Sequence, residues 1–393
     1  MKRVFQVWIQ EYRNIFSDTA ALLLFFGAIL LYPIVYPIPY LQEVLRKVPV
    51  AVVDLDYSQS SRALIRMVNA SESVAVVLMP DNLAQAENAF YRGEVHGVLV
   101  IAEDFNKTLL QGRQAQVLIY ADASYFLIYR TVMTGVGKSS RFFSAGIEIK
   151  RLMASGLSQN QAMAVRDPVE LISIPLFNPF GGYANYVVPA VLVLLLQQTL
   201  LIGTGLLGGT AREQHNALFF LHNGSKSASV FPVIIGKTLA YGSLYWVHAL
   251  YYFSVVYRFY NFPLRSEPAA LLCFLFPFLL SVILLGIALS TLFQSRETSM
   301  LVLVFTSIPI LFLAGFSWPV ECLPKWLRAL SQLLPSTPGI AGLVKMNQMG
   351  ASLQEVKNEW GVLWGQCALY LVFAAICFRR VARCSGASDG PNS

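Results

Sequence analysis

The sequence predicts a mainly helical membrane protein with six transmembrane helices and one extracytoplasmic α/β domain. Of its 393 residues, 55% are hydrophobic and 13% are charged, whereas soluble chains carry roughly 25% charged residues. Apolar runs of about 20 residues recur, and at ~1.5 Å per residue such a run crosses a ~30 Å hydrocarbon core. Only residues 41–182 have a soluble character, with short β-branched runs alternating with helical patterns, as in α/β domains.

Residues 1–18 form a predicted amphipathic helix that lies in the membrane interface. Its polar residues, among them Glu11, lie on the faces of the helix that the apolar residues leave free. The apolar residues recur at one-and-four spacing: Val4, Phe5, Trp8, Ile9, Tyr12, Ile15 and Phe16. Residues 19–40 are the first predicted transmembrane helix, because the run is too long for a cleaved signal and no Ala-x-Ala site follows it.

The predicted α/β domain spans residues 41–182. Four β-branched runs bounded by turn residues predict strands at 48–54, 74–79, 97–102 and 116–122. Helical patterns lie between the first three runs, at 58–69 and 82–92, and Asn82 with Gln85 has capping-box spacing. From Ser124 the pattern is helical to about Val165, which predicts a long helical arm, and a last extended segment follows at 169–177.

Five more apolar runs predict transmembrane helices at residues 183–207, 230–256, 269–293, 300–316 and 361–378. A polar loop, residues 208–229, joins the first two of these runs. Residues 317–360 are rich in proline and predict short, broken interfacial helices, and 379–393 form a tail. The glycine pairs 205/209 and 361/365 have helix-packing spacing, and contact within one chain or between two chains is equally compatible with them.

The distribution of basic residues in short flanks predicts the orientation. One side carries nine: Lys2, Arg3, Arg13, Arg212, Lys226, Arg296, Arg379, Arg380 and Arg383. The other side carries six: Arg258, Arg265, Lys325, Arg328, Lys345 and Lys357. Both termini and the 208–229 loop are therefore expected in the cytoplasm, and the α/β domain and residues 317–360 outside.

Sequence motifs do not support an enzyme. The Gly-Lys-Ser at 137–139 and the Gly-Lys-Thr at 236–238 lack the glycine that a phosphate-binding loop needs five positions earlier, where Val132 and Phe231 stand. Asp54 and Asp56 resemble a phosphatase nucleophile pair, but no later acidic cluster accompanies them. The four histidines and five cysteines have no metal-site spacing, and no basic run with interleaved aromatics indicates nucleic-acid binding.

The predicted membrane helices contain no aspartate or glutamate. Their ionisable residues are Lys237, which is expected to reach the cytoplasmic interface, and His248. Transport coupled to ions or protons needs ionisable groups inside the bilayer. A transport activity would therefore take its energy from a partner.

The order of these parts resembles the permease subunits of ATP-binding-cassette exporters, in the type-2 permease family and its subgroup with a large periplasmic domain between spans one and two. The local similarity is greatest at residues 315–319 (GFSWP), 323–327 (LPKWL) and 334–338 (LPSTP), which resemble the outer re-entrant segment of that family. Residues 53–58 are similar to the first strand of the outer domain, and 236–241 to the start of the third span.

The resemblance implies two candidate sites. The first cytoplasmic loop of the family holds a coupling helix that docks on the ATPase. The corresponding residues here are Arg212, Glu213, Ala217, Leu218 and Phe219, of which Arg212 and Glu213 match the family pattern directly. The outer re-entrant segment is represented by Gly315, Pro319, Pro324, Trp326 and Pro335.

The expected function is that of a multi-pass permease subunit in a bacterial inner membrane, which exports an amphiphilic, drug-like or lipid-linked substrate. The chain itself would bind no cofactor, metal or nucleic acid, and ATP would be used by a separate cytoplasmic ATPase. The resemblance also implies a second permease subunit, as a homodimer or with a paralogue, and a periplasmic membrane-fusion adaptor. The alternative is a membrane-anchored sensor or assembly protein, which the short tail after the last span disfavours because it leaves no room for a signalling domain.

Overall fold

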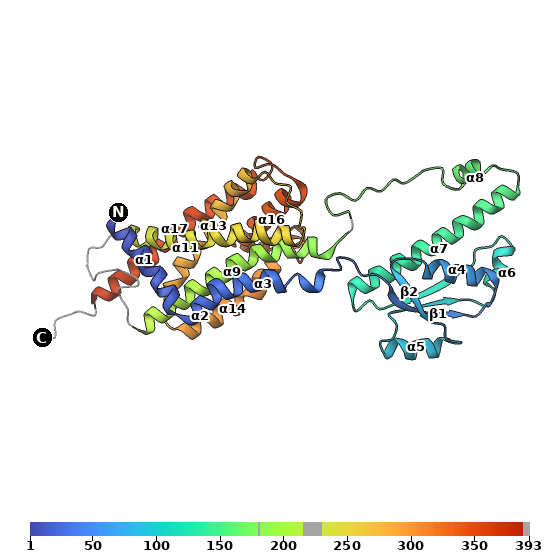
Figure 1. Ribbon diagram of the computed structural model, residues 1–393, viewed down its shortest axis with the longest axis horizontal. Coiled ribbons are helices and arrows are strands. Elements are labelled where there is room, and N and C mark those ends of the chain that lie inside the picture. Colours follow the sequence, from blue (N-terminus) through green and yellow to red (C-terminus); the bar gives the residue numbers. More distant parts are fainter. Residues whose placement is uncertain (180, 215–229, 388–393) are drawn as a thin grey trace. The chain divides into compact units, whose positions relative to one another are not determined.

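The computed structural model describes residues 1–179, 181–214 and 230–387 and is mainly helical (Figure 1). The chain divides into two compact units. The helical unit consists of Met1–Glu43 and Pro175–Ser393, and the α/β unit consists of Val44–Ile174.

The α/β unit contains a four-stranded sheet. Its strands are β1 (Val48–Asp54), β2 (Val74–Leu78), β3 (Gly97–Ile101) and β4 (Val117–Ala121), which confirms the four predicted strands. The order is β2-β1-β3-β4; β1 pairs in parallel with β2 and β3, and β3 pairs antiparallel with β4. The central strand β1 is buried along almost its whole length, because side chains on both faces of a covered parallel sheet are shielded from water.

Helices cover both faces of this sheet. α4 (Gln59–Asn69) begins at Ser58, whose side chain forms a capping box with Ser61, and α5 (Leu83–Tyr91) begins at Asn82, whose side chain accepts from the backbone N–H of Gln85. The core on one face joins residues of α4, α6 (Phe105–Leu110) and α7 (Phe126–Ala154) to the sheet, and the other face packs against α5. The predicted long arm is α7 followed by α8 (Gln159–Arg166), and the residues that follow have no regular secondary structure.

The helical unit begins with α1 (Lys2–Ser17), as the amphipathic pattern predicted. A nearly continuous helix follows, made of α2 (Thr19–Leu22), the π-helical turn η1 (Leu23–Ala28), α3 (Ile29–Val35) and the 3₁₀ turn η2 (Ile38–Tyr40). The other long helices are α9 (Tyr183–Glu213), α11 (Phe231–Leu250) with η3 (Tyr251–Val256) and α12 (Tyr257–Phe259), α13 (Pro268–Ser290), α14 (Arg296–Leu313) and α17 (Lys357–Ala387).

Within the described residues, five helical segments are long and apolar enough to cross a membrane: Thr19–Tyr40, Tyr183–Glu213, Pro268–Ser290, Arg296–Leu313 and Lys357–Val381. The stretch from α11 to α12, the third predicted span in chain order, is helical but is not among these five. It carries Lys237, His248 and several tyrosines, which lower its mean hydropathy.

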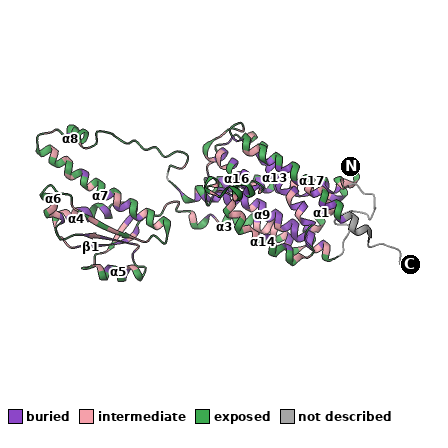
Figure 2. Cartoon of the chain, turned by 180° about the vertical axis from the view of Figure 1, so that it is seen from behind, coloured by how far each residue is buried: buried purple, intermediate pink, exposed green. Residues whose placement is uncertain are grey.

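α9 is the central helix of this unit. In its most apolar stretch 89% of the residues are buried, against 11% in α14, and Figure 2 shows α9 as buried over most of its length. Glycines permit the contacts: an added Cβ at Gly203 would lie 2.4 Å from the ring of Phe25, and one at Gly205 would lie 2.5 Å from Leu303. Gly361 and Gly365 have no neighbour within 4 Å of such a Cβ, so only the first of the two glycine pairs packs inside this part of the chain.

Residues 317–360 form the short helices that the prolines predicted. These are η4 (Val320–Cys322), α15 (Lys325–Ser331), α16 (Ser336–Val344) and the π-helical turn η5 (Lys345–Met349). α16 is largely buried, and its first backbone N–H, at Ser336, donates to Gln197 Oε1 of α9 over 2.7 Å. The segment is therefore anchored to α9 by a polar contact as well as by apolar packing.

Candidate functional site

The carboxyl end of α9 lies against the turn between α13 and α14. An added Cβ at Gly208 would lie 2.2 Å from the backbone oxygen of Ser290, and one at Gly209 would lie 2.4 Å from that of Ser295. Any larger side chain at these positions would collide with backbone atoms. The two glycines therefore allow the end of α9 to touch the backbone at the end of α13 and at the start of α14.

The last residues of α9 bond to the same turn. Glu213 Oε1 accepts the backbone N–H of Arg296 over 3.0 Å, and the Arg212 guanidinium donates to the backbone oxygen of Thr291 over 3.4 Å. Arg296 is the first residue of α14, and a carboxylate is stabilised beside the partial positive charge of a helix amino end. The C-terminal end of one span thus caps the N-terminal end of another.

Arg296 extends this contact to the first two helices. Its guanidinium forms an ion pair with Asp18, with an Nη2 to Oδ1 distance of 3.0 Å, and also donates to Thr210 Oγ1 over 3.3 Å. Asp18 Oδ1 caps α2 by accepting from the N–H groups of Ala20 and Ala21, each over 3.0 Å.

These contacts change the pKa of the Asp18 carboxyl. Partial burial favours the neutral acid, but the bonds from Arg296 and the cap N–H groups outweigh it, and the pKa of the Asp18 carboxyl is lowered. The ionised carboxylate is therefore the form that the folded chain favours.

We call Asp18, Thr210, Arg212, Glu213 and Arg296 the charged junction. It joins α1–α2, the end of α9 and the α13–α14 turn through hydrogen bonds and one ion pair. Among the described residues no group of three or more His, Cys, Asp or Glu side chains could hold a metal ion. The arrangement is suited to transmitting force between helices.

The structure brings two of the five predicted coupling residues, Arg212 and Glu213, into this junction. Ala217, Leu218 and Phe219 lie outside the described residues. Sequence reasoning missed Asp18 and Arg296 as partners of this site. The sequence placed both residues close to the start of a predicted span. Asp18 directly precedes the first span, where a helix cap is expected, and Arg296 lies four residues before the span at 300–316.

The five residues predicted for the outer re-entrant segment lie at the other end of α14. Since α14 has 18 residues, its two ends are separated by about 27 Å at ~1.5 Å per residue. Gly315 follows the helix with a φ of +88°, Pro319, Pro324 and Pro335 each directly precede a short helix, and Trp326 is exposed. The structure therefore places the two predicted sites apart.

Glu11 and Lys237 correct two sequence predictions. Glu11, expected on the polar face of α1, is 2% exposed, and Lys237, expected to reach the interface, is 1% exposed. They form an ion pair, and the Tyr241 hydroxyl donates to Glu11 Oε2 over 2.8 Å. Gly236 makes this possible, because a Cβ there would lie 2.6 Å from Val7 of α1. The tight α1–α11 contact supplies Lys237 with a carboxylate, so its side chain does not extend to water.

Comparison with known proteins assigns the family. Residues 20–376 match the model of the ABC-2 family transporter proteins. A curated relative, the linearmycin resistance permease protein LnrN of Bacillus subtilis (strain 168), is 26% identical over 113 residues, which cover 29% of this chain and 28% of that protein. The match to this relative thus spans less than a third of its length, whereas the family match spans most of this chain. The chain belongs to the ABC-2 transporter permease family.

Proposed function

We propose that the chain is the membrane-spanning permease subunit of an ATP-driven exporter, and that a separate cytoplasmic ATP-binding-cassette ATPase supplies the energy. The observation that carries this proposal is the charged junction, which ties the end of α9 to the α13–α14 turn and to α1–α2. The residues that follow Gln214 are the predicted docking segment, so the junction stands next to the point where an ATPase would act. The family match supports the same reading.

The proposed topology has six spans, with both termini in the cytoplasm and the α/β unit in the periplasm, as in the subgroup with a large periplasmic domain. The helix from Phe231 to Phe259 is the third span in chain order and completes the six. Its 29 residues would extend about 43 Å at ~1.5 Å per residue, more than the hydrocarbon core requires. The Glu11–Lys237 ion pair removes the objection that a charged residue makes this helix unsuited to the bilayer, since paired charges are tolerated there.

The proposed mechanism uses the junction as a rigid connection. Movement of the ATPase would push on the end of α9, and Glu213 would pass that displacement to the amino end of α14 through its bond to Arg296. Arg296 would pass it on to Asp18 and so to the first span. The first, second and fifth spans would then tilt together, as packed helices do in domain movements.

A second permease subunit, a copy or a paralogue, completes the proposed transporter. The face of α14 is where we place this subunit, because only 11% of its apolar stretch is buried within the chain. Its outward side chains are large and apolar: Leu301, Val304, Phe305, Ile308 and Phe312.

The substrate would be amphiphilic, drug-like or lipid-linked, and the α/β unit would pass it to a periplasmic membrane-fusion adaptor.

Co-purification tests the ATPase partner. The tagged chain would be expressed with the ATP-binding-cassette ATPases of its own genome, and the detergent-solubilised complex would be isolated. The proposal predicts a stable complex from the wild type, a weakened one from Glu213→Ala, and a normal one from Glu297→Ala, which removes an exposed carboxylate one residue beyond Arg296. An ATPase that never co-purifies with the wild type would contradict the proposal.

A further inference from the structure

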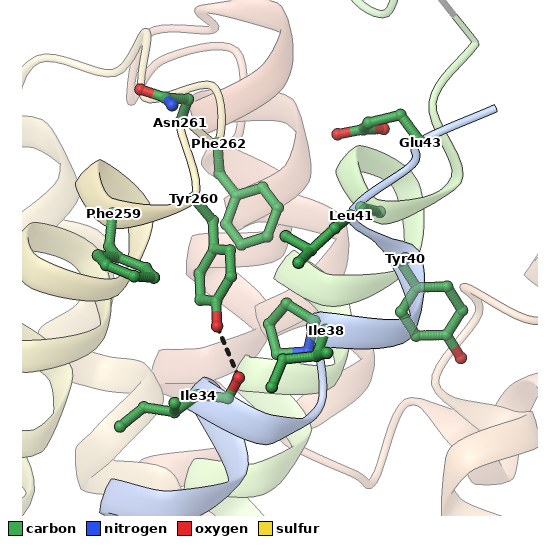
Figure 3. A pocket seen from close by; sticks show the side chains of 11 residues that line it. Ile34, Ile38, Tyr40, Leu41, Glu43, Phe259, Tyr260, Asn261 and Phe262 are labelled. Carbon is green, nitrogen blue, oxygen red and sulfur yellow. Dashed lines mark hydrogen bonds between the residues drawn. The ribbon is translucent and has the colours of Figure 1, made fainter.

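A pocket of about 660 Å³ lies in the helical unit, between the end of the first span and the residues that follow α12. Its volume is within the range of small-molecule sites. Most of the wall is apolar or aromatic, and among the described residues Glu43 is the one charged residue that lines it. Figure 3 shows the Glu43 carboxylate at one side of the pocket, and the rings of Tyr260 and Phe262 on another side.

Glu43 is held in place by the amino end of α9. Its backbone has a φ of +57°, its carbonyl oxygen accepts the N–H of Tyr183 over 2.9 Å, and its Oε1 accepts the side-chain amide of Asn185 over 2.9 Å. A Cβ at Gly182 would collide with the carboxylate. The position of the charge is therefore fixed by the backbone around it.

This carboxylate has unused acceptor capacity. Glu43 Oε2 and Asn185 Oδ1 are both buried and have no hydrogen-bond partner among the described residues. A buried acceptor without a donor is energetically unfavourable. Burial raises the pKa of the Glu43 carboxyl, against the opposing effect of the Asn185 backbone N–H. A group with several N–H donors and a positive charge would complement the Glu43 carboxylate, which lines the pocket.

The aromatic wall suits the same kind of ligand. The rings of Tyr260 and Phe262 are stacked with centroids 5.6 Å apart, and the ring of Phe259 meets that of Tyr260 edge-on at 4.9 Å. The Tyr260 hydroxyl donates to the backbone oxygen of Ile34 over 2.6 Å, which fixes the ring (Figure 3). Aromatic faces attract ammonium groups and accommodate alkyl chains.

We propose that this pocket is a binding site for amphiphilic primary amines, with the ammonium group on Glu43 and the hydrocarbon body against Phe259, Tyr260 and Phe262. No lysine or arginine of the described residues lines the pocket, so these residues offer an anionic amphiphile no counter-charge. A primary ammonium has three N–H donors for the Glu43 carboxylate, which lines the pocket, whereas a quaternary ammonium has none. The site therefore prefers the primary amine. The proposal concerns binding and does not depend on the ATP-driven export proposed above.

Binding of dodecylamine tests the proposal on the full chain in phosphatidylcholine nanodiscs, without an ATPase. We expect Glu43→Gln to weaken dodecylamine binding by about ten-fold or more, because a charge-assisted contact is lost. The same variant should bind dodecanol as the wild type does, which shows an intact pocket. Glu321→Gln, which removes an exposed carboxylate, is the matched control and should leave both ligands unaffected. Phe259→Ala should weaken both.

Three results would overturn the proposal. They are unchanged dodecylamine binding in Glu43→Gln, equal loss of dodecylamine and dodecanol in that variant, and wild-type affinity for dodecyltrimethylammonium equal to that for dodecylamine. Nanodiscs of phosphatidylethanolamine distinguish the source of the natural amine. If phosphatidylethanolamine competes with dodecylamine, the natural ligand of the site is a bilayer lipid. If dodecylamine binding is undiminished in these nanodiscs, the natural ligand is an amine that is not a bilayer lipid.

Discussion

Two ion pairs attach the N-terminal helices to the rest of the helical unit, and they differ in burial. The side chains of Glu11 and Lys237 are 3% and 1% exposed, whereas those of Asp18 and Arg296 are 13% and 32% exposed. Loss of one partner from a buried pair leaves an uncompensated charge away from water, and this costs far more than it does at a surface. The Glu11–Lys237 pair is therefore the stronger structural constraint. The Asp18–Arg296 pair is accessible enough to respond to solvent and pH.

Glu11→Gln should destabilise the chain by about 3–5 kcal/mol, because Lys237 loses the carboxylate that balances its buried charge. The double variant Glu11→Gln/Lys237→Met removes both charges and should recover most of this loss. Thermal unfolding in detergent measures both changes. A single variant as stable as the wild type would show that the pair does not hold α1 on α11.

Asp18→Asn keeps the oxygen that caps α2 but removes the charge opposite Arg296. We expect a loss of about 1–3 kcal/mol, the range for hydrogen bonds to charged groups, and a larger loss for Asp18→Ala, which also removes the cap. Because the pKa of Asp18 is lowered in the folded chain, the ion pair contributes fully above the ordinary carboxyl pKa of about 4. Its contribution is lost as the pH falls through the lower, folded value.

The pH dependence provides a separate measurement. The difference in melting temperature between the wild type and Asp18→Asn should be constant from neutral pH to about pH 5 and should shrink below about pH 4. A difference that grows on acidification would contradict the assigned direction of the pKa shift.

Helix α9 packs closely against several other segments of the helical unit. Its glycines at 203, 205, 208 and 209 bring the first span, α13 and α14 within contact distance of its backbone. Close packing of this kind fixes neighbours in discrete arrangements and transmits displacement. The contacts at Gly208 and Gly209 are made with backbone atoms, which cannot rotate away as side chains do.

Gly209→Ala should therefore force α9 away from the α13–α14 turn. Overpacking of this kind costs about 1–3 kcal/mol, and it should also weaken the Glu213 contact with Arg296. Gly365→Ala is the matched control, since a Cβ there meets nothing within 4 Å. A lower melting temperature for Gly209→Ala, with no loss for Gly365→Ala, is the expected result. Equal losses of melting temperature at the two positions would show that the close approach of α9 to the α13–α14 turn does not cause the destabilisation.

Elements with a strong local signal were predictable from the sequence. The strands of the α/β unit follow their β-branched runs, and α5 begins at the predicted cap, Asn82. The burial of Glu11 was not predictable, because periodicity assigns a polar residue to the exposed face and cannot include a lysine that lies 226 positions later. Asp18 and Arg296 were missed for the same reason, since their pairing depends on how three helices pack.

At the scale of the whole molecule, α1, the end of α9 and the end of α17 lie at one end of the helical unit (Figure 1). The basic residues that predicted the cytoplasmic side flank these same ends. Family membership followed from the order of parts and from local motifs, and residues 20–376 match the family model. The coupling residues beyond Gln214 stay a prediction.

Cysteine labelling tests the proposed orientation. In a cysteine-free background, Tyr91→Cys in the α/β unit and Glu321→Cys after α14 should react with a membrane-impermeant maleimide in intact spheroplasts. Both positions are exposed. Glu297→Cys, exposed at the start of α14, should react only after permeabilisation. Labelling of Glu297→Cys in intact spheroplasts would place the charged junction outside and contradict the orientation.

Force from an ATPase is proposed to enter the chain through the end of α9, and stimulated ATP hydrolysis measures this coupling. The ATPase would be reconstituted in proteoliposomes with the wild type, Glu213→Ala or Glu297→Ala, and its rate compared with that of the ATPase alone. We expect stimulation by the wild type and by Glu297→Ala, and a stimulation reduced by about ten-fold for Glu213→Ala, because the bond that connects α9 to α14 is lost. Full stimulation by Glu213→Ala would contradict the claim.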